Sequence, residues 1–244
     1  CGRTYRRGSK DGHKQVHLRT RQGVPSYRRI PPLRALFVQC LPSEGCQVSA
    51  EEPHVISALI GLCKQHNIKT LVQVGAEDGY EADEIRKATE CRTVCIDADY
   101  KCVPVNNAIE WHYQMIGATD GPADFYTNVS IGLSSPYQRG NDHGEEKKEQ
   151  QQMRLDTFCA EHGITPDALI IDTEGSTLDV LEGCGDLLNG VKMIYAEIQA
   201  YAIRPGIRPV SDVDALLLPL GFTHHRGLPS YDGGAQSNLT WVKP

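Results

Sequence analysis

The strongest constraint on the fold is an alternation of short apolar runs with helical repeats, which begins near residue 52. Apolar runs of strand length occupy 70–74, 93–97, 109–116, 168–172 and 193–198. In the segments beside these runs, apolar residues recur at helical spacing, as in Leu178, Leu181 and Cys184. Strands that alternate with helices form a mostly parallel sheet with right-handed crossovers. We therefore predict an α/β fold.

The C-terminal part breaks this alternation. Ser211, with Asp214 three residues on, resembles a capping box at the start of a helix that stops at Gly221. The segments 222–224 and 238–242 then look like a closing strand pair around the turn 232–234, which would add antiparallel strands at one edge of the sheet. The polar stretch 139–152 is the best candidate for a mobile loop or lid, or for a disordered insertion.

Composition and charge divide the chain in two. The 244 residues are 40% hydrophobic and 23% charged, as in globular proteins, and no apolar run is long enough to span a membrane. Residues 1–34 contain ten Lys/Arg and one acid, giving +9; since the whole chain carries −6, the rest carries −15. We expect a basic N-terminal extension at 1–50 and a folded domain at 51–244. The extension can contact nucleic acid, anionic lipid or a phosphorylated substrate, fold against the acidic body, or remain a solvated tail.

Cysteine usage indicates a reducing compartment. The nine cysteines form no C-x-x-C pair, although Cys40 and Cys46 are close enough in sequence to bridge. We expect reduced thiols and a cytoplasmic protein. The chain starts without a methionine or an apolar signal core, so we expect a fragment or a trimmed product.

A glycine-containing turn follows the first apolar run. The run ends in Val74-Gly75-Ala76-Glu77-Asp78-Gly79, and the second run ends in Asp97, where a carboxylate can accept hydrogen bonds from ribose hydroxyls. In an open α/β sheet the ligand lies beyond these strand ends. The G-x-x-x-G spacing lacks the third glycine of the dinucleotide pattern, which disfavours a pyrophosphate. A ligand with ribose but no phosphate fits better, and S-adenosylmethionine is the common one.

Several motifs occur in order along the chain: 155–158, the D-x-E-G at 172–175, 178–183 and 195–198. Together they resemble the FkbM family of methyltransferases. The 74–79 turn matches the family's V-G-A-N-x-G except at Glu77, which replaces the usual Asn. The segment 116–121 resembles the family's A-L-S-D-x-x-G, and Asp97-Ala98 stands where Glu-Pro is more frequent. The resemblance covers about residues 65–242.

This resemblance implies a Rossmann-like class I methyltransferase fold. Such a fold has a seven-stranded, mostly parallel sheet with an antiparallel terminal strand and helices on both faces, here with an added N-terminal extension. It also implies O-methylation of a hydroxyl on a sugar, a glycan, or a glycosylated or polyketide-like small molecule. The residues expected to bind S-adenosylmethionine are Val74, Gly75, Ala76, Glu77, Gly79, Asp97, Ala98, Ala118, Asp120 and Asp172.

Three acids are expected near the transferred methyl group: Asp172, Glu174 and Glu197. Methyl transfer requires an aligned acceptor and removal of its hydroxyl proton. We expect Asp172 or Glu197 to be the general base, since repulsion among the acids raises at least one pKa. Glu174 either orients the acceptor or cofactor, or caps the following helix. The same acids are also suited to hold Mg²⁺.

The candidate acceptor contacts are Arg204, Arg208 and His224, all beyond the fifth apolar run. Two other classes of function stay open. The basic extension suits an RNA ribose methyltransferase or a nucleic-acid-binding protein. A second convincing lysine beside Lys192, needed for ribose methylation, is missing. The other class is an inactive scaffold that keeps the fold, although the retained acids argue against it.

Overall fold

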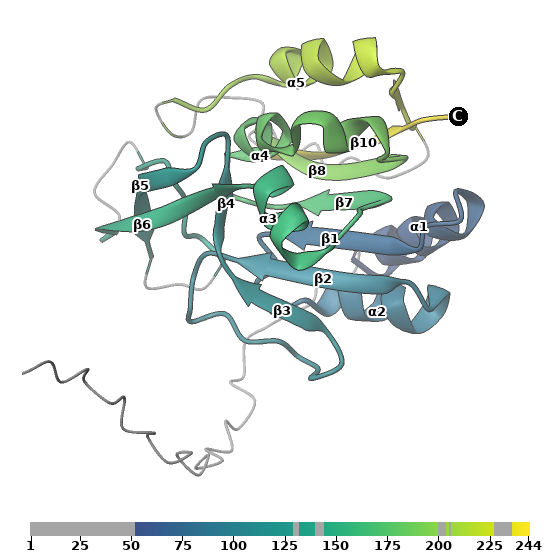
Figure 1. The fold of residues 1–244 in the computed structure, drawn as a ribbon, viewed down its shortest axis with the longest axis horizontal. Coiled ribbons are helices and arrows are strands. Elements are labelled where there is room, and N and C mark those ends of the chain that lie inside the picture. The colour runs from purple at the N-terminus through teal and green to yellow at the C-terminus, as the bar shows by residue number, and fades with distance from the viewer. Residues whose placement is uncertain (1–51, 129–131, 140–143, 200–203, 205, 227–235) are drawn as a thin grey trace, which may run out of the picture. The chain divides into compact units, whose positions relative to one another are not determined.

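The fold is built around a seven-stranded sheet of order β3-β2-β1-β7-β8-β10-β9 (Figure 1). The computed structural model describes residues 52–128, 132–139, 144–199, 204, 206–226 and 236–244. The basic extension, Cys40, Cys46 and the turn at 232–234 lie outside these described residues.

Five neighbouring strands of this sheet are parallel: β3 (Glu110–Tyr113), β2 (Arg92–Asp97), β1 (Thr70–Val74), β7 (Ala168–Ile171) and β8 (Met193–Gln199). β10 (Gln236–Val242) is antiparallel to β8 and to the edge strand β9 (Thr223–His224). The mostly parallel sheet and its antiparallel terminal strand are confirmed. The chain moves outward from β1 to β3 and then returns to β7, so the strand order reverses between β1 and β7.

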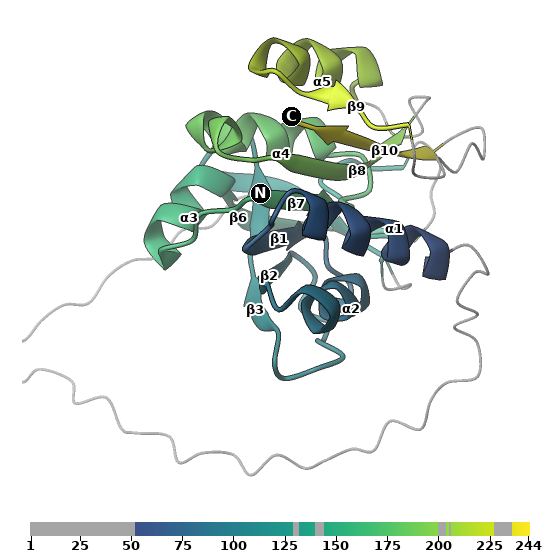
Figure 2. The ribbon, with the colours of Figure 1, turned by 90° about the vertical axis from the view of Figure 1, so that its right-hand side faces the viewer.

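Helices cover both faces of the sheet (Figure 2). Buried residues of α1 (Glu52–Gln65) and α2 (Tyr80–Thr89) pack with one set of strand residues, which includes Leu71 and Ile170. Those of α3 (Leu155–His162), α4 (Thr177–Cys184) and α5 (Val210–Leu217) pack with the alternate set, which includes Val72 and Leu169. The central strands are therefore buried on both faces, which is why they are continuous apolar runs in the sequence.

A second, three-stranded sheet of order β4-β6-β5 was not expected. Its strands are β4 (Met115–Gly117), β5 (Gly121–Thr127) and β6 (Glu146–Arg154). The apolar run 109–116 therefore supplies two strands of different sheets instead of one. The prediction of a mobile or disordered stretch at 139–152 is wrong for 146–152, which belongs to β6. Pairing with β4 and β5 satisfies the backbone of β6, so the strand forms without apolar periodicity.

The predicted capping box is also wrong. α5 begins at Val210 after Pro209, so Ser211 lies inside the first turn, and its hydroxyl contacts Asp212. The 3₁₀ helix η2 (Leu218–Leu220) extends α5 to Gly221, and η1 (Gly185–Asn189) follows α4. Within the described residues, no helix has the length and apolar character to cross a membrane.

Candidate active site

A cavity that is partly open to solvent lies beyond the carboxyl ends of β1, β2 and β7. This is the reversal point of the strand order, where open α/β sheets bind ligands. Its polar wall comes from the strand ends and includes Glu77, Asp97, Asp172 and Glu174. Its apolar wall comes largely from the small sheet and from segment 132–136, and includes Met115, Ile116, Phe125 and Pro136.

The turns after β1 and β7 are in direct contact. Gly75 has φ +75°, and a Cβ at this position would lie 1.7 Å from the carbonyl oxygen of Asp172. The Asp172 amide donates to the Val74 carbonyl, and the Gly75 amide donates to the Ile96 carbonyl. The backbone thereby brings the glycine turn and the acidic turn to the same edge of the cavity.

Asp97 lies at the end of β2 with its carboxylate on the cavity wall. One carboxylate oxygen accepts from the Glu77 amide at 2.9 Å and the other from the Asp99 amide at 2.7 Å. Burial raises the pKa of Asp97, and these backbone hydrogen bonds oppose the shift. Each oxygen keeps acceptor capacity for a ligand hydroxyl. Together with the glycine turn, this donor and acceptor set fits a ribose-containing cofactor such as S-adenosylmethionine.

The conformation at residue 77 accounts for the Asn found at this position in the motif that the turn resembles. Glu77 has φ +52°, in the left-handed region that Asn tolerates better than most side chains. The backbone amide of Glu77 bonds Asp97 in this conformation. The backbone thus requires a left-handed conformation at residue 77, and Glu adopts this conformation at a higher energetic cost than Asn.

Asp172 follows β7 and lines the cavity. Its side chain is open to water on the cavity side, whereas protein surrounds it elsewhere. This desolvation, followed by the charges of Glu197 and Glu174, raises the pKa of Asp172 well above its usual value. Glu197, half-buried on β8, acts on Asp172 from the neighbouring strand but does not line the cavity.

Glu174 occupies the turn between β7 and α4 with φ +51°. Its carboxylate lies 3.6 Å from the Arg139 guanidinium and 3.7 Å from that of Arg204. Burial raises the pKa of Glu174, and the two arginines oppose this shift. α4 begins after Ser176 without a side-chain cap, so the alternative role of Glu174 at the start of this helix gains no hydrogen bond.

The proposed Mg²⁺ ligand set does not form. Within the part of the chain that the structure describes, no three His, Cys, Asp or Glu side chains are grouped to hold a metal ion. One oxygen of the Glu174 carboxylate, Oε2, faces two arginines, and Glu197 lies outside the cavity wall. Glu197 and Glu174 therefore act on Asp172 electrostatically without forming a shared ligand set.

Four of the ten expected cofactor residues do not line the cavity. Ala76 is buried in the core beside α1 and α2, and Gly79, at φ +73°, begins α2. Ala118 and Asp120 lie in the turn between β4 and β5. There the Ala118 carbonyl accepts from Arg154, and Asp120 accepts from the Arg154 amide and from Thr157. Val74, Gly75, Glu77, Asp97, Ala98 and Asp172 line the cavity.

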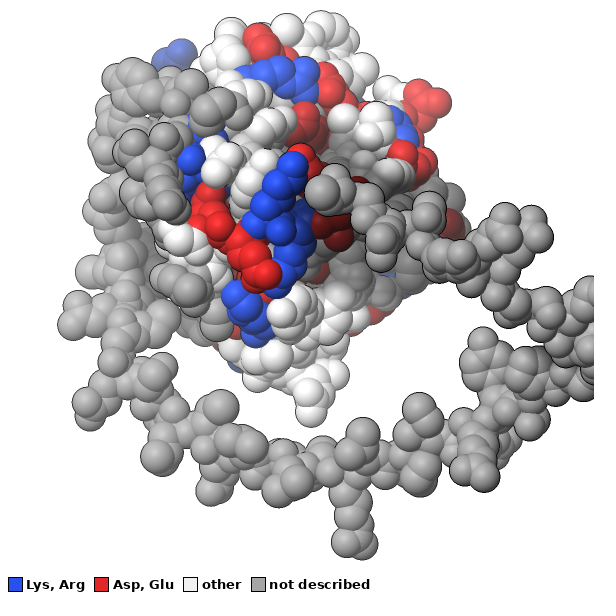
Figure 3. All heavy atoms as spheres, turned by 90° about the vertical axis from the view of Figure 1, so that its left-hand side faces the viewer, with Lys and Arg blue, Asp and Glu red and all other residues white. Residues whose placement is uncertain are grey.

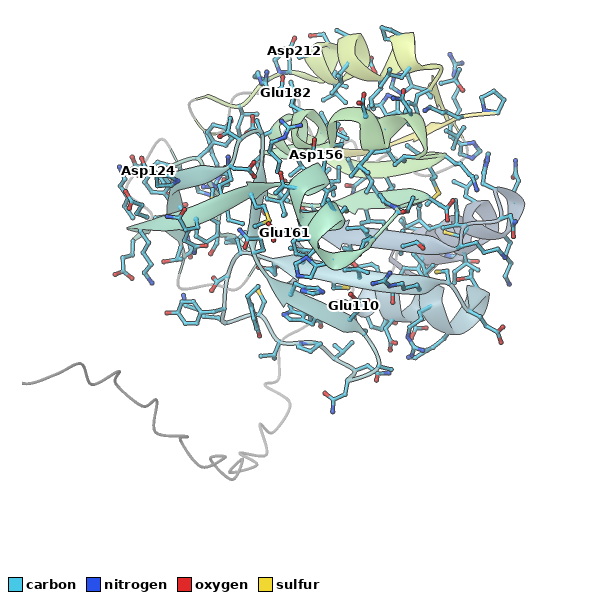
Figure 4. All side chains as sticks on the ribbon, viewed as in Figure 1. Glu110, Asp124, Asp156, Glu161, Glu182 and Asp212 are labelled. Atoms are coloured by element: carbon cyan, nitrogen blue, oxygen red, sulfur yellow. The ribbon has the colours of Figure 1, made fainter. Side chains whose placement is uncertain are left out.

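None of the three expected acceptor contacts lines the cavity. Arg204 is fully buried, with its guanidinium bonded to Glu145 and to main-chain carbonyls. Arg208 pairs with Asp179 and Glu182 of α4, and Figure 4 labels Glu182 between α4 and α5. His224 lies on the edge strand β9, 2.9 Å from Asp214 of α5.

Sequence reasoning missed the contribution of the small sheet. Phe125 of β5 lines the cavity, and the Gln150 side chain of β6 donates to the Ala98 carbonyl at 3.3 Å. Cys102 also lines the cavity, and its thiol lowers the pKa of Asp97. No local pattern could have found these residues, because long-range strand pairing places them there.

The outer surface of the small sheet carries paired charges. Lys147 lies 2.7 Å from Asp124, and Lys148 lies 3.1 Å from Glu146. Figure 3 shows basic and acidic side chains next to one another among the described residues of the face that includes this sheet. These residues therefore form no continuous basic surface.

The family model of the methyltransferase FkbM domain matches residues 73–223. No curated protein matches the chain significantly. Among solved structures, the chain is similar to a precorrin-6y C5,15-methyltransferase from Geobacter metallireducens GS-15, with 8% identity, a TM-score of 0.46 and coverage of 78% of this chain and 88% of that one. Human N-acetylserotonin methyltransferase in complex with SAM has 12% identity, a TM-score of 0.37 and coverage of 77% and 51%. An O-methyltransferase family protein from Burkholderia thailandensis has 9% identity, a TM-score of 0.43 and coverage of 79% and 56%.

Proposed function

Because the chain belongs to the FkbM methyltransferase domain family, we propose that it is an S-adenosylmethionine-dependent O-methyltransferase. Its acceptor is a hydroxyl of a sugar, a glycan, or a glycosylated or polyketide-like small molecule. The observation that carries the proposal is Asp172, a carboxylate of raised pKa that lines the cavity next to the glycine turn.

Residues at the ends of β1 and β2 hold the cofactor. Asp97 would accept hydrogen bonds from its ribose hydroxyls, and the left-handed conformations of Gly75 and Glu77 would let the backbone of this turn hold it closely. When bound, S-adenosylmethionine supplies an electrophilic methyl group. The apolar wall formed by Met115, Ile116 and Phe125 keeps water away from it.

Asp172 is the proposed general base, because an acceptor hydroxyl becomes a nucleophile only as its proton leaves. A base works best when its pKa lies near the operating pH, and the surrounding protein together with the charge of Glu197 raises the pKa of Asp172 in that direction. Glu174 faces the same cavity and orients the acceptor through its carboxylate. Carboxylates accept hydrogen bonds from hydroxyls, which supports a polyhydroxylated acceptor.

The test is transfer of a labelled methyl group to a panel of glycans, small-molecule glycosides, polyketide-like alcohols and RNA. We expect an alkali-stable methyl ether on a non-nucleic-acid acceptor. Asp172→Asn should lower kcat by about 10²–10⁴-fold while S-adenosylhomocysteine still binds by calorimetry. Asp124→Asn, on the outer surface of β5, is the matched control and should keep the wild-type rate. Label found only in RNA, or a wild-type rate in Asp172→Asn, would contradict the proposal.

A further inference from the structure

Arg204 is a fully buried cation beside the proposed active site. Its side chain has 0% exposure, and one guanidinium nitrogen lies 2.9 Å from the Glu145 carboxylate. The guanidinium also donates to the carbonyls of Tyr137 and Leu133. A buried charge is costly unless it is paired and hydrogen-bonded; these contacts supply a paired carboxylate and two carbonyl acceptors, while the buried Nε donates no hydrogen bond within the described residues. The arginine is thus a fixed part of the structure and is not available to an acceptor.

The partners of Arg204 hold the segment 132–139 against the cavity. Glu145, whose side chain is 3% exposed, accepts from the Arg139 amide with its second oxygen at 3.0 Å. The Ser135 hydroxyl donates to the Glu174 carbonyl at 2.9 Å, and the Tyr137 hydroxyl donates to Asp179. Because Ser134 and Pro136 of this segment line the cavity, the Arg204 contacts fix one of its walls.

Arg204 also faces Glu174. The Glu174 carboxylate oxygen that lies 3.7 Å from Arg204 and 3.6 Å from Arg139 is buried and accepts no hydrogen bond. The two guanidinium groups therefore offset part of the cost of burying the negative charge of this oxygen. Asp172, two residues earlier on the same turn, is the neighbouring like charge.

We propose that Arg204 is a positioning residue of the reaction: it holds the Glu174 carboxylate in place at the cavity and joins it to the wall formed by segment 132–139. This inference rests on the proposed function, in which Glu174 orients the acceptor. Arg204 touches neither the cavity nor the expected cofactor residues, so it affects the methyl-transfer step more than cofactor binding.

The charges around Glu174 set the expected direction of its titration. Burial raises the pKa of Glu174, Arg204 is the first and Arg139 the second group that lowers it, and Glu145 competes for Arg204. Glu174 in turn raises the pKa of Asp172, as does Glu197. Removing Arg204 leaves Arg139 as the nearest cation, so Glu174 takes up a proton at a higher pH.

The first experiment measures this titration by carboxyl NMR on ¹³C-Glu-labelled protein, with Glu174→Gln to assign the signal. In Arg204→Met the pKa of Glu174 should rise by about one unit or more, whereas Arg204→Lys should stay near wild type because it keeps the charge. An unchanged titration in Arg204→Met overturns the proposal. This readout needs no acceptor, so it stands apart from the outcome of the acceptor screen.

The second experiment separates positioning from support of the fold. Arg204→Met leaves Glu145 buried without its partner, so we also use Arg204→Met/Glu145→Met, in which both charges are removed and stability is regained. This double variant should bind S-adenosylhomocysteine normally and keep a kcat at least tenfold below wild type, with KM changed less. Recovery of wild-type kcat together with stability would show a structural role only and overturn the proposal.

A mutant cycle with Glu174→Gln completes the test. If Arg204 acts through Glu174, then adding Arg204→Met/Glu145→Met to Glu174→Gln should lower kcat by less than about twofold further. Independent, multiplying losses would show that Arg204 acts by another route and would contradict the inference.

Discussion

The carbonyl oxygen of Asp172 occupies the place where a side chain on Gly75 would have to begin, since a Cβ there would lie 1.7 Å from that oxygen. The residue that turns the chain after β1 and the proposed base after β7 are thus positioned by one backbone contact. The absence of a side chain at residue 75 keeps the two turns together.

Gly75→Ala should therefore disrupt both the fold and cofactor binding. The new methyl overlaps the Asp172 carbonyl, and φ +75° is strained for an L-residue, so we expect a loss of about 2 kcal/mol or more in the free energy of unfolding. Gly61→Ala is the matched control, because it lies in α1 with no heavy atom near its Cβ. It should stabilise the helix by about 0.5–1 kcal/mol. Urea unfolding of both variants checks the contrast, and equal effects would refute the close approach.

Asp97→Asn should weaken binding of S-adenosylhomocysteine by about tenfold or more, because a neutral amide replaces a charged acceptor of ribose hydroxyls. Asp120→Asn is the informative counterpart. Asp120 accepts hydrogen bonds from the Arg154 amide and from Thr157 and does not line the cavity. The Asp120→Asn variant should therefore bind S-adenosylhomocysteine with the wild-type affinity. Calorimetry decides, and a larger loss in Asp120→Asn than in Asp97→Asn would reverse the assignment of the two acids.

Glu77→Asn should stabilise the protein while cofactor binding is retained. Residue 77 has φ +52°, and Asn accepts this conformation at lower cost than Glu, so we expect a gain of up to about 1 kcal/mol in the free energy of unfolding. Glu77→Gln removes the charge but keeps the conformational cost. If Glu77→Gln stabilises as much as Glu77→Asn, the gain comes from charge and the conformational explanation fails.

Asp172→Asn should raise the melting temperature at neutral pH although it lowers kcat. The pKa of Asp172 is higher in the folded protein than in the unfolded chain, so ionisation of Asp172 disfavours the folded state. This loss of stability begins above the unfolded value of about 3.9 and grows until the pH passes the folded pKa. Melting curves should therefore show a gain in Asp172→Asn at pH 8 that vanishes near pH 4. A lower melting temperature at pH 8 would argue against the raised pKa.

The sequence by itself determined the central sheet and the sheet edge at which the candidate site lies. Strands buried on both faces must be continuous apolar runs, and each of β1, β2, β7 and β8 was visible as one. Parallel strands bring their carboxyl ends to the same edge, so Gly75, Asp97 and Asp172 were expected to meet there before any contact was known.

Only the tertiary structure decided which side chains complete the site. β6 is polar, and it is a strand because β4 and β5 supply its backbone partners. The sequence predicted that Arg204 contacts the acceptor. Its burial could not be predicted, because it depends on Leu133, Tyr137 and Glu145, which lie 59–71 residues away in sequence. Local periodicity reports which face of an element is apolar. It carries no information on which distant carboxylate and carbonyls will surround a charge. These long-range contacts bury Arg204 beside Glu174, where it cannot contact an acceptor.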